Sequence, residues 1–378
     1  MRCAKKYIWV FLIILMLLGV CSIHTFAQNE ETEDLKSVEE LSETIYDAIN
    51  DDAAAMLDEL NLSDFSMDGV LALSPRTVID ALLSVITDGF GAPLRAAVLL
   101  CAVAVLANLS SVFLLGESKI QTAFDLCTVL IVSCILAQSL TNLLEIAFSV
   151  VSLCSDFMLT YIPGFAGIIA MSGKPLTSAA YGSVMVGIAN LYAQSGVKYF
   201  LPFLLVYLSL SVFSSLQEKY ALLPIVRCLQ KIIYTVLGLA ATLFSGLITV
   251  KGALATGGDS VTVKGVKMLV GSAVPIVGGA LSEGVTSVLA SATLIKSTVG
   301  VFGILVIVCT TLPAVIQLLL WYVALSFAGA VSESLGQTRI KNLLQSIAGV
   351  LSVTNAFVIF TAYIFIISTG VILQFRGA

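Results

Sequence analysis

Between Pro93 and Phe375 the sequence consists of apolar blocks of roughly 18 to 30 residues, each long enough to cross ~30 Å of hydrocarbon as a helix. Lipid cannot hydrogen-bond a free backbone, and the blocks are too long and too uniformly apolar for barrel strands, so they must be helices. The chain is 58% hydrophobic and 11% charged, which excludes an ordinary soluble domain. The sequence therefore predicts an all-α polytopic membrane protein.

Residues 92–378 are expected to form the transmembrane domain, with about eight crossings that begin and end outside. The expected spans are 94–115, 120–144, 150–170, 177–194, 199–216, 232–250, 299–323 and 347–373. Segment 268–295 is ambiguous, either a Gly/Pro-rich re-entrant hairpin or a ninth span. Lys and Arg are almost equally divided between the two sides under either topology, so the positive-inside rule does not decide. Pro275 and the Gly278-Gly279 pair interrupt this segment, and broken helices at membrane depth usually line a cavity, which favours the hairpin.

Residues 1–27 have the pattern of a secretory signal peptide. Three basic residues precede an apolar run from Tyr7 to Val20, and Thr25-Phe26-Ala27 offers a small-residue cleavage site. We expect cleavage after Ala27, with an uncleaved anchor as the main alternative. A lipoprotein site at Cys21 is less favoured, because Val20 stands where a small residue is required.

Metal, cofactor and catalytic chemistry have little support in the residue inventory. Cleavage after Ala27 removes His24, the only histidine, and with it any imidazole ligand or histidine general base. The six cysteines of the mature chain lie in or beside apolar spans, and no Cys-x-x-Cys occurs, so neither a disulfide framework nor a thiolate metal site is indicated. We expect no catalytic residues, no bound metal and no cofactor, and therefore not an enzyme.

Residues 28–91 are expected to form a small acidic, helical region outside the membrane. From Gln28 to Val70 there are fourteen acidic residues and one base, Lys36. Apolar residues recur there at three- and four-residue steps, which is typical of an amphipathic helix; the candidate partner-docking residues are Leu35, Val38, Leu41, Ile45 and Ile49. The alternative is a helix that packs on its own neighbours or lies exposed. The negative charge argues against binding to nucleic acid.

Two acids inside the apolar region are candidates for a transport path or a gate. Glu283 is the only charged residue between Met268 and Ile295, and Asp156 lies seven residues before Pro163-Gly164. Ionisable groups at membrane depth usually face the bundle interior or a water-filled cavity. With Pro275, Gly278 and Gly279, Glu283 could therefore complete a polar pocket. A structural ion pair with Lys296, or with a base of a partner, is the competing interpretation.

Three short motifs carry little weight on their own. Gly173-Lys174-Pro175 imitates the end of a phosphate loop, but Pro175 replaces the Ser or Thr that would bind Mg²⁺. Gly257-Gly258-Asp259 resembles only a fragment of an intramembrane aspartyl protease signature. Leu229-Gln230-Lys231-Ile232 and Leu344-Gln345-Ser346-Ile347 each open an apolar span, which is a weak sign of an internal repeat.

Four motifs in a fixed order carry a family resemblance. They are Gly-Leu-Ile-Thr-Val-Lys-Gly from 246, Ser-Val-Thr-Val-Lys from 260, Val-Pro-Ile-Val-Gly-Gly-Ala-Leu-Ser-Glu from 274 and Leu-Ile-Lys-Ser-Thr-Val-Gly from 294. Together with the signal peptide, the acidic exported segment and the chain length, they resemble the stage III sporulation protein AE family over essentially the whole protein.

The resemblance implies a role in endospore formation. Members of that family belong to a channel or secretion-like complex in the outer forespore membrane, joined to a forespore membrane partner and energised by a separate ATPase. Residues 28–91 would then project into the intermembrane space, and the implied partners include ring-forming subunits. Three functions stay open: a subunit that contributes to the transport conduit, which is favoured; a platform that anchors ring and ATPase subunits without conducting; and an ion-coupled permease.

Overall fold

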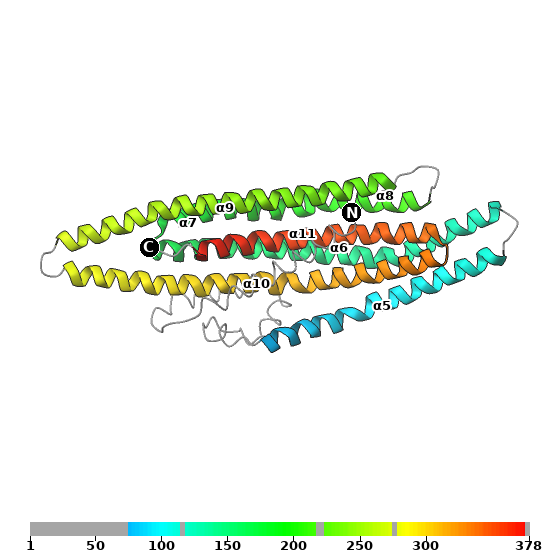
Figure 1. Ribbon diagram of the computed structural model, residues 1–378, viewed down its shortest axis with the longest axis horizontal. Helices are drawn as coiled ribbons and strands as arrows, with labels where there is room; N and C mark the ends of the chain where they lie inside the picture. The colour runs from blue at the N-terminus through cyan, green and yellow to red at the C-terminus, as the bar shows by residue number, and fades with distance from the viewer. Residues whose placement is uncertain (1–74, 114–117, 217–222, 274–277, 375–378) are drawn as a thin grey trace.

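The computed structural model describes residues 75–113, 118–216, 223–273 and 278–374 (Figure 1). Every secondary-structure element in these ranges is helical, which confirms the predicted all-α class. The elements are α5 (Pro75–Phe113), α6 (Ser118–Met171), α7 (Pro175–Ser195), the π-helical turn η2 (Gly196–Phe200), α8 (Leu201–Leu216), α9 (Leu223–Ala273), α10 (Gly278–Ser334) and α11 (Thr338–Gln374). The signal peptide and most of the acidic region, including the candidate docking residues Leu35, Val38, Leu41, Ile45 and Ile49, lie outside the described residues.

The described chain forms six continuous helical rods that alternate in direction (Figure 1). The elements α7, η2 and α8 follow one another without a gap and form one rod; α5, α6, α9, α10 and α11 form the others. Within the described residues, six helical stretches are long and apolar enough to cross a membrane. They are Leu83–Ser110, Ala123–Met171, Lys198–Ser215, Pro224–Lys264, Leu289–Ser334 and Thr338–Leu373. These stretches fit a multi-pass membrane protein.

Four of the eight expected spans fall in pairs, and each pair lies on one continuous rod. Spans 120–144 and 150–170 both fall on α6, because no Gly or Pro lies between them to break the helix. Spans 177–194 and 199–216 are joined through η2. Pro202 has no N–H to donate to the preceding turn, and a π-helical turn just before it accommodates the missing hydrogen bond. The eight apolar blocks thus lie on six rods, and the number of crossings stays a prediction.

The centre of the bundle is formed by α10 and α11. In an 18-residue apolar portion of each, 72% and 61% of the residues are buried, against 17% in the corresponding portion of α9, which lies at the outside. Close packing at Gly303 joins α10 to α6: a Cβ atom there would lie 2.5 Å from the ring of Tyr161, whose hydroxyl donates to the Val299 carbonyl at 3.0 Å. Tyr161 also stacks between Phe157 and Phe165. The interior is therefore filled with side chains at this level.

Segment 268–295 forms the end of α9 and the start of α10. Figure 1 shows these two helix ends reaching beyond their neighbours α6, α7 and α11. A break occurs where the Gly/Pro pattern predicts one, since α9 ends at Ala273 and α10 begins at Gly278; Pro275 lies outside the described residues. The break joins two helices of 51 and 57 residues, and whether their ends re-enter a membrane stays a prediction.

Candidate functional site

A tight turn between α6 and α7 begins the candidate site. Gly173 has a φ of 78°, and its N–H donates to the Ala170 carbonyl at 3.1 Å, while the Lys174 N–H donates to the Ile169 carbonyl at 3.3 Å. This is the Schellman arrangement, in which a left-handed residue closes the end of a helix. A Cβ atom on Gly173 would also lie 2.8 Å from the Leu289 side chain. Both backbone conformation and space therefore require glycine here.

Asp259 of α9 caps the N-terminus of α7 from a distance of 82 residues in sequence. Its carboxylate accepts the Leu176 N–H at 2.8 Å, the Thr177 N–H at 2.9 Å and the Thr177 hydroxyl at 2.6 Å. These N–H groups are the donors that a Ser, Thr, Asp or Asn at the N-cap normally satisfies. The residue before Pro175 is Lys174, whose side chain has no acceptor, so Asp259 takes over the role.

Lys296 of α10 meets the opposite end of another helix in the same region. Its side chain is 2% exposed, and its Nζ donates to the Ile372 carbonyl at 3.2 Å. Because α11 ends at Gln374, this carbonyl belongs to the last turn, which has no partner within the helix. A cation at a helix C-terminus is favoured by the helix dipole. Lys296 therefore caps α11.

Lys174, Asp259 and Lys296 together form what we call the charged node. All three are buried; Lys174 and Asp259 attract each other, whereas Lys174 and Lys296, two positive charges, repel each other. Burial lowers the pKa of the Lys174 ammonium, and the Asp259 carboxylate opposes this shift. Ions in a low-dielectric interior are tolerated only when paired and hydrogen-bonded. Asp259 meets that condition through the attraction of Lys174 and three hydrogen bonds from α7, and Lys296 is held by its hydrogen bond to the last turn of α11, so the node connects the α6–α7 turn, α9, α10 and α11.

The node was not predicted as a site. Lys174 and Asp259 belong to two of the short motifs that indicated no function in the sequence. These are Gly173-Lys174-Pro175 and Gly257-Gly258-Asp259. The structure brings these motifs together: at Gly258 a Cβ atom would lie 2.6 Å from Leu176, so glycine permits the close approach of α9 to α7. The sequence did contain a sign of this site, because each motif places one isolated charged residue next to glycine.

The predicted path residues are not brought together by the described structure. Asp156 is exposed on the surface of α6, so it does not line the interior of this chain's bundle. Gly278 and Gly279 are the first residues of α10, and the side chain of Glu283 lies outside the described residues. Glu283 and Lys296 are thirteen residues apart on α10, about 20 Å of helix rise. A direct ion pair between those two is therefore excluded, whereas pairing of Glu283 with a base of a partner stays a prediction.

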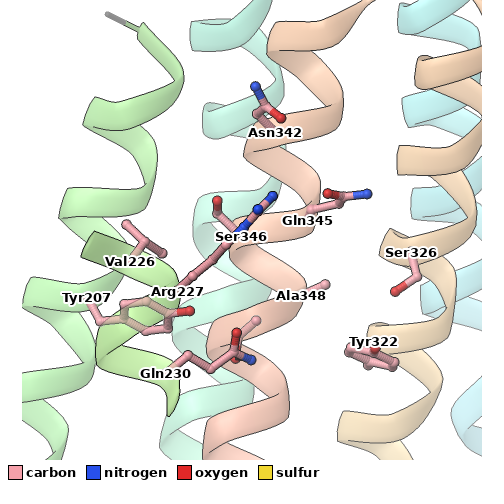
Figure 2. Close-up of a pocket in the computed structure, with 11 residues that line it drawn as sticks. Tyr207, Val226, Arg227, Gln230, Tyr322, Ser326, Asn342, Gln345, Ser346 and Ala348 are labelled. Atoms are coloured by element: carbon pink, nitrogen blue, oxygen red, sulfur yellow. Dashed lines mark hydrogen bonds between the residues drawn. The ribbon is translucent and has the colours of Figure 1, made fainter. Parts of the chain in front are cut away.

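A polar cavity of about 420 Å³ lies toward the other end of the bundle, between α8, α9, α10 and α11 (Figure 2). Gln230 and Gln345, from the two similar sequence stretches, both line it. The Gln230 side-chain amide reaches the Gly349 carbonyl at 3.5 Å, and deeper in the bundle the Tyr234 and Ser352 hydroxyls lie 2.6 Å apart. The lining residues are Tyr207, Val226, Arg227, Gln230, Tyr322, Ser326, Asn342, Gln345, Ser346, Ala348 and Gly349.

Comparison with known proteins gives one consistent answer. The family model described as stage III sporulation protein AE matches residues 60–375, a range that contains all the described helices. Stage III sporulation protein AE of Bacillus subtilis (strain 168) is 24% identical over 353 residues, which cover 88% of each of the two chains. No solved structure matches the chain. The family match confirms the resemblance seen in the sequence motifs: the chain belongs to the stage III sporulation protein AE family.

Proposed function

We propose that this protein is a membrane subunit of the sporulation channel that links mother cell and forespore, and that it contributes one wall of the transport conduit. Its family membership supports a role in sporulation, and its six apolar rods fit a multi-pass membrane protein. The proposed location is the outer forespore membrane, with residues 28–91 in the intermembrane space. The protein has no enzymatic part in this proposal; a separate ATPase supplies the energy.

The outward face of α9 carries this proposal. Polar or small residues recur along it at four- and three-residue steps, so they share one side of the helix; they are Lys231, Thr235, Gly238, Thr242, Ser245 and Thr249. Four of the six, between positions 235 and 249, carry a Thr or Ser hydroxyl group. All six residues are exposed or half-buried. The stripe covers eighteen residue steps, about 27 Å, which is close to the hydrocarbon thickness. We call it the hydroxyl stripe.

The apolar face of α9 lies beside the hydroxyl stripe. It contains Val236, Leu239, Leu243 and Val250, all more than half exposed. Lipid suits such side chains. The Thr235, Thr242 and Thr249 hydroxyls donate to carbonyls one turn earlier in α9, so lipid would tolerate them, but the oxygen of each keeps room to accept a further hydrogen bond from water. Because the interior of a single bundle is filled near Tyr161 and Gly303, a conduit would run along the outside of the chain, between α9 and neighbouring subunits.

A cysteine pair on α9 tests the proposal. Thr242→Cys and Leu243→Cys place one thiol on the hydroxyl stripe and one on the apolar face, in a background without native cysteines. In sporulating cells, a water-soluble thiol reagent should label the cysteine at position 242 much faster than that at 243, and labelling at 242 should reduce forespore development. Equal and slow labelling at both positions would place the stripe against lipid or protein and contradict the conduit.

A non-conducting platform is the second candidate function. The packed interior favours it, since a bundle filled by Tyr161, Phe157 and Phe165 holds its shape and needs no passage. Such a platform would anchor ring and ATPase subunits through the acidic region. Deletion of residues 30–60 should then abolish recruitment of ring subunits to the membrane while the membrane domain stays intact; recruitment that survives the deletion removes the chief support for this function.

The ion-coupled permease gains no support from the charged node. Both carboxylate oxygens of Asp259 accept hydrogen bonds from α7, and Lys296 donates to the end of α11. These groups serve as helix caps.

A further inference from the structure

The polar cavity has the chemistry of a site for an anion. Arg227 contributes a guanidinium, and Gln230, Asn342 and Gln345 contribute side-chain amides, while hydroxyl groups complete the lining. None of the described residues that line the cavity is acidic. Figure 2 shows Arg227 extending from α9 across the cavity toward Ser346 on α11. Guanidinium and amide groups in such an arrangement donate several hydrogen bonds to a phosphate or carboxylate group.

The helices around the cavity add to its preference for negative charge. The helices α9 and α11 run in the same direction and both begin at this end of the bundle, at Leu223 and Thr338 (Figure 1). Val226 closes the first turn of α9, and Arg227 and Asn342 each follow the first turn of their helix. A helix N-terminus carries a partial positive charge. The lining of the cavity includes no residue from the last turn of α8 or α10, whose C-termini would oppose this effect.

The position of the cavity along the rods indicates which anion is available. Charged side chains gather at the same end of the bundle: Lys231 next to Arg227, and Arg339 and Lys341 beside the α10–α11 turn, where Lys341 pairs with Glu333. Charged residues concentrate at the level of lipid headgroups, where they remain hydrated. A cavity at this level is within reach of phospholipid headgroups, and basic pockets between membrane helices bind them.

We propose that the polar cavity binds the phosphate headgroup of an anionic phospholipid, with Arg227 as its principal contact and the amides of Gln230 and Gln345 as further donors. A volume of about 420 Å³ accommodates the phosphate and its glycerol, with the acyl chains outside. A water-soluble phosphate ester would use the same chemistry. The proposal is independent of the conduit, because it concerns binding that purified protein displays without a sporulation assay.

The experiment is native mass spectrometry of the full chain in detergent, titrated with phosphatidylglycerol, with phosphatidylcholine, or with glycerol 3-phosphate. Phosphatidylglycerol should bind in preference to phosphatidylcholine. Arg227→Gln should weaken its binding about tenfold and Gln345→Leu should weaken it less, because each removes donors from the cavity. Lys231→Gln is the matched control: it removes the same charge one turn further along α9, outside the lining, and should leave binding unchanged. All three residues are exposed or partly exposed, and a thermal unfolding scan verifies that each variant is folded.

Three results would be informative. Phosphatidylglycerol binding that depends on Arg227 but not on Lys231 supports a lipid headgroup site. Glycerol 3-phosphate binding with the same dependence, and no preference for phosphatidylglycerol, supports the phosphate site with a soluble ligand. Equal weakening by Arg227→Gln and Lys231→Gln, or no phosphate binding at all, overturns the proposal, because the cavity would then contribute nothing beyond the general positive charge of this surface.

Discussion

The carboxylate of Asp259 caps α7 by accepting two hydrogen bonds from Thr177, one from its backbone N–H at 2.9 Å and one from its hydroxyl at 2.6 Å. Both residues are about 1% exposed. The first turn of a helix leaves N–H groups without a partner inside the helix, and here the buried Asp259 carboxylate supplies the acceptor. The interaction therefore fixes the axial position of α9 against α7, and it gives Asp259, the one acidic residue of α9, a structural role.

Asp259→Asn should lower the stability of the membrane domain. The amide is the same size, but its NH₂ group faces N–H donors, so at least one buried hydrogen bond is lost, at a cost of roughly 1–3 kcal/mol. We expect a lower thermal unfolding temperature in detergent. Asp156→Asn is the control, because Asp156 is exposed on α6 and its substitution should leave the unfolding temperature unchanged. Equal unfolding temperatures for both variants would show that the cap contributes nothing.

Local features of the fold could be predicted from the sequence, whereas contacts between distant segments could not. Apolar blocks and breakers follow from local physics: the blocks predicted helices, and Pro275 with the Gly278-Gly279 pair correctly marked the break between α9 and α10. The boundary expected between spans 120–144 and 150–170 falls at Glu145, yet an exposed carboxylate on a helix surface does not break its hydrogen bonds, so α6 continues. Polarity alone therefore overestimated the number of separate helices.

The charged node could not be predicted, because its partners are far apart in sequence. Lys174 and Asp259 are separated by 85 positions and Lys296 by a further 37, and nothing local indicates that their helices meet. Glu283 attracted the functional prediction because it is isolated among apolar residues. The same criterion applied to Asp259 and Lys296 would have included the node, since each also stands among apolar or small residues within a long helix.

Gly173 and Gly336 form a matched pair for testing backbone strain against steric overlap. Their φ angles are 78° and 77°, so alanine at either position should cost about 1 kcal/mol in conformational strain. At Gly336 a Cβ atom meets nothing within 4 Å, whereas at Gly173 it would lie 2.8 Å from Leu289. Thermal unfolding should therefore show a larger loss of stability for Gly173→Ala than for Gly336→Ala. Equal losses would mean that Leu289 moves aside at no cost.

Glu283→Gln tests whether the acid at the start of α10 belongs to the conduit. The substitution removes the charge without changing the size of the side chain, so assembly should persist while sporulation efficiency falls if the carboxylate acts on transport. Glu333→Gln is the control on the same helix, because Glu333 is exposed at the far end and pairs with Lys341. Normal sporulation of the Glu283→Gln strain would count against a role of this residue in the path.

Cysteine accessibility tests the membrane orientation that the rods imply. Ser260 follows Asp259 at the charged node, which also contains Lys296, and Ser334 ends α10 thirty-eight residues after Lys296, about 57 Å of helix rise. If α10 crosses the membrane, a separation larger than the ~30 Å hydrocarbon core puts the two serines on opposite sides. In a cysteine-free background, Ser260→Cys should label with an impermeant reagent from outside, and Ser334→Cys only after permeabilisation.

Ser282→Cys, one residue before Glu283, should label slowly from outside if the start of α10 lines a wet cavity. Labelling of both 260 and 334 from the same side would contradict the transmembrane arrangement of α10, and Glu283 would then be a contact between helices.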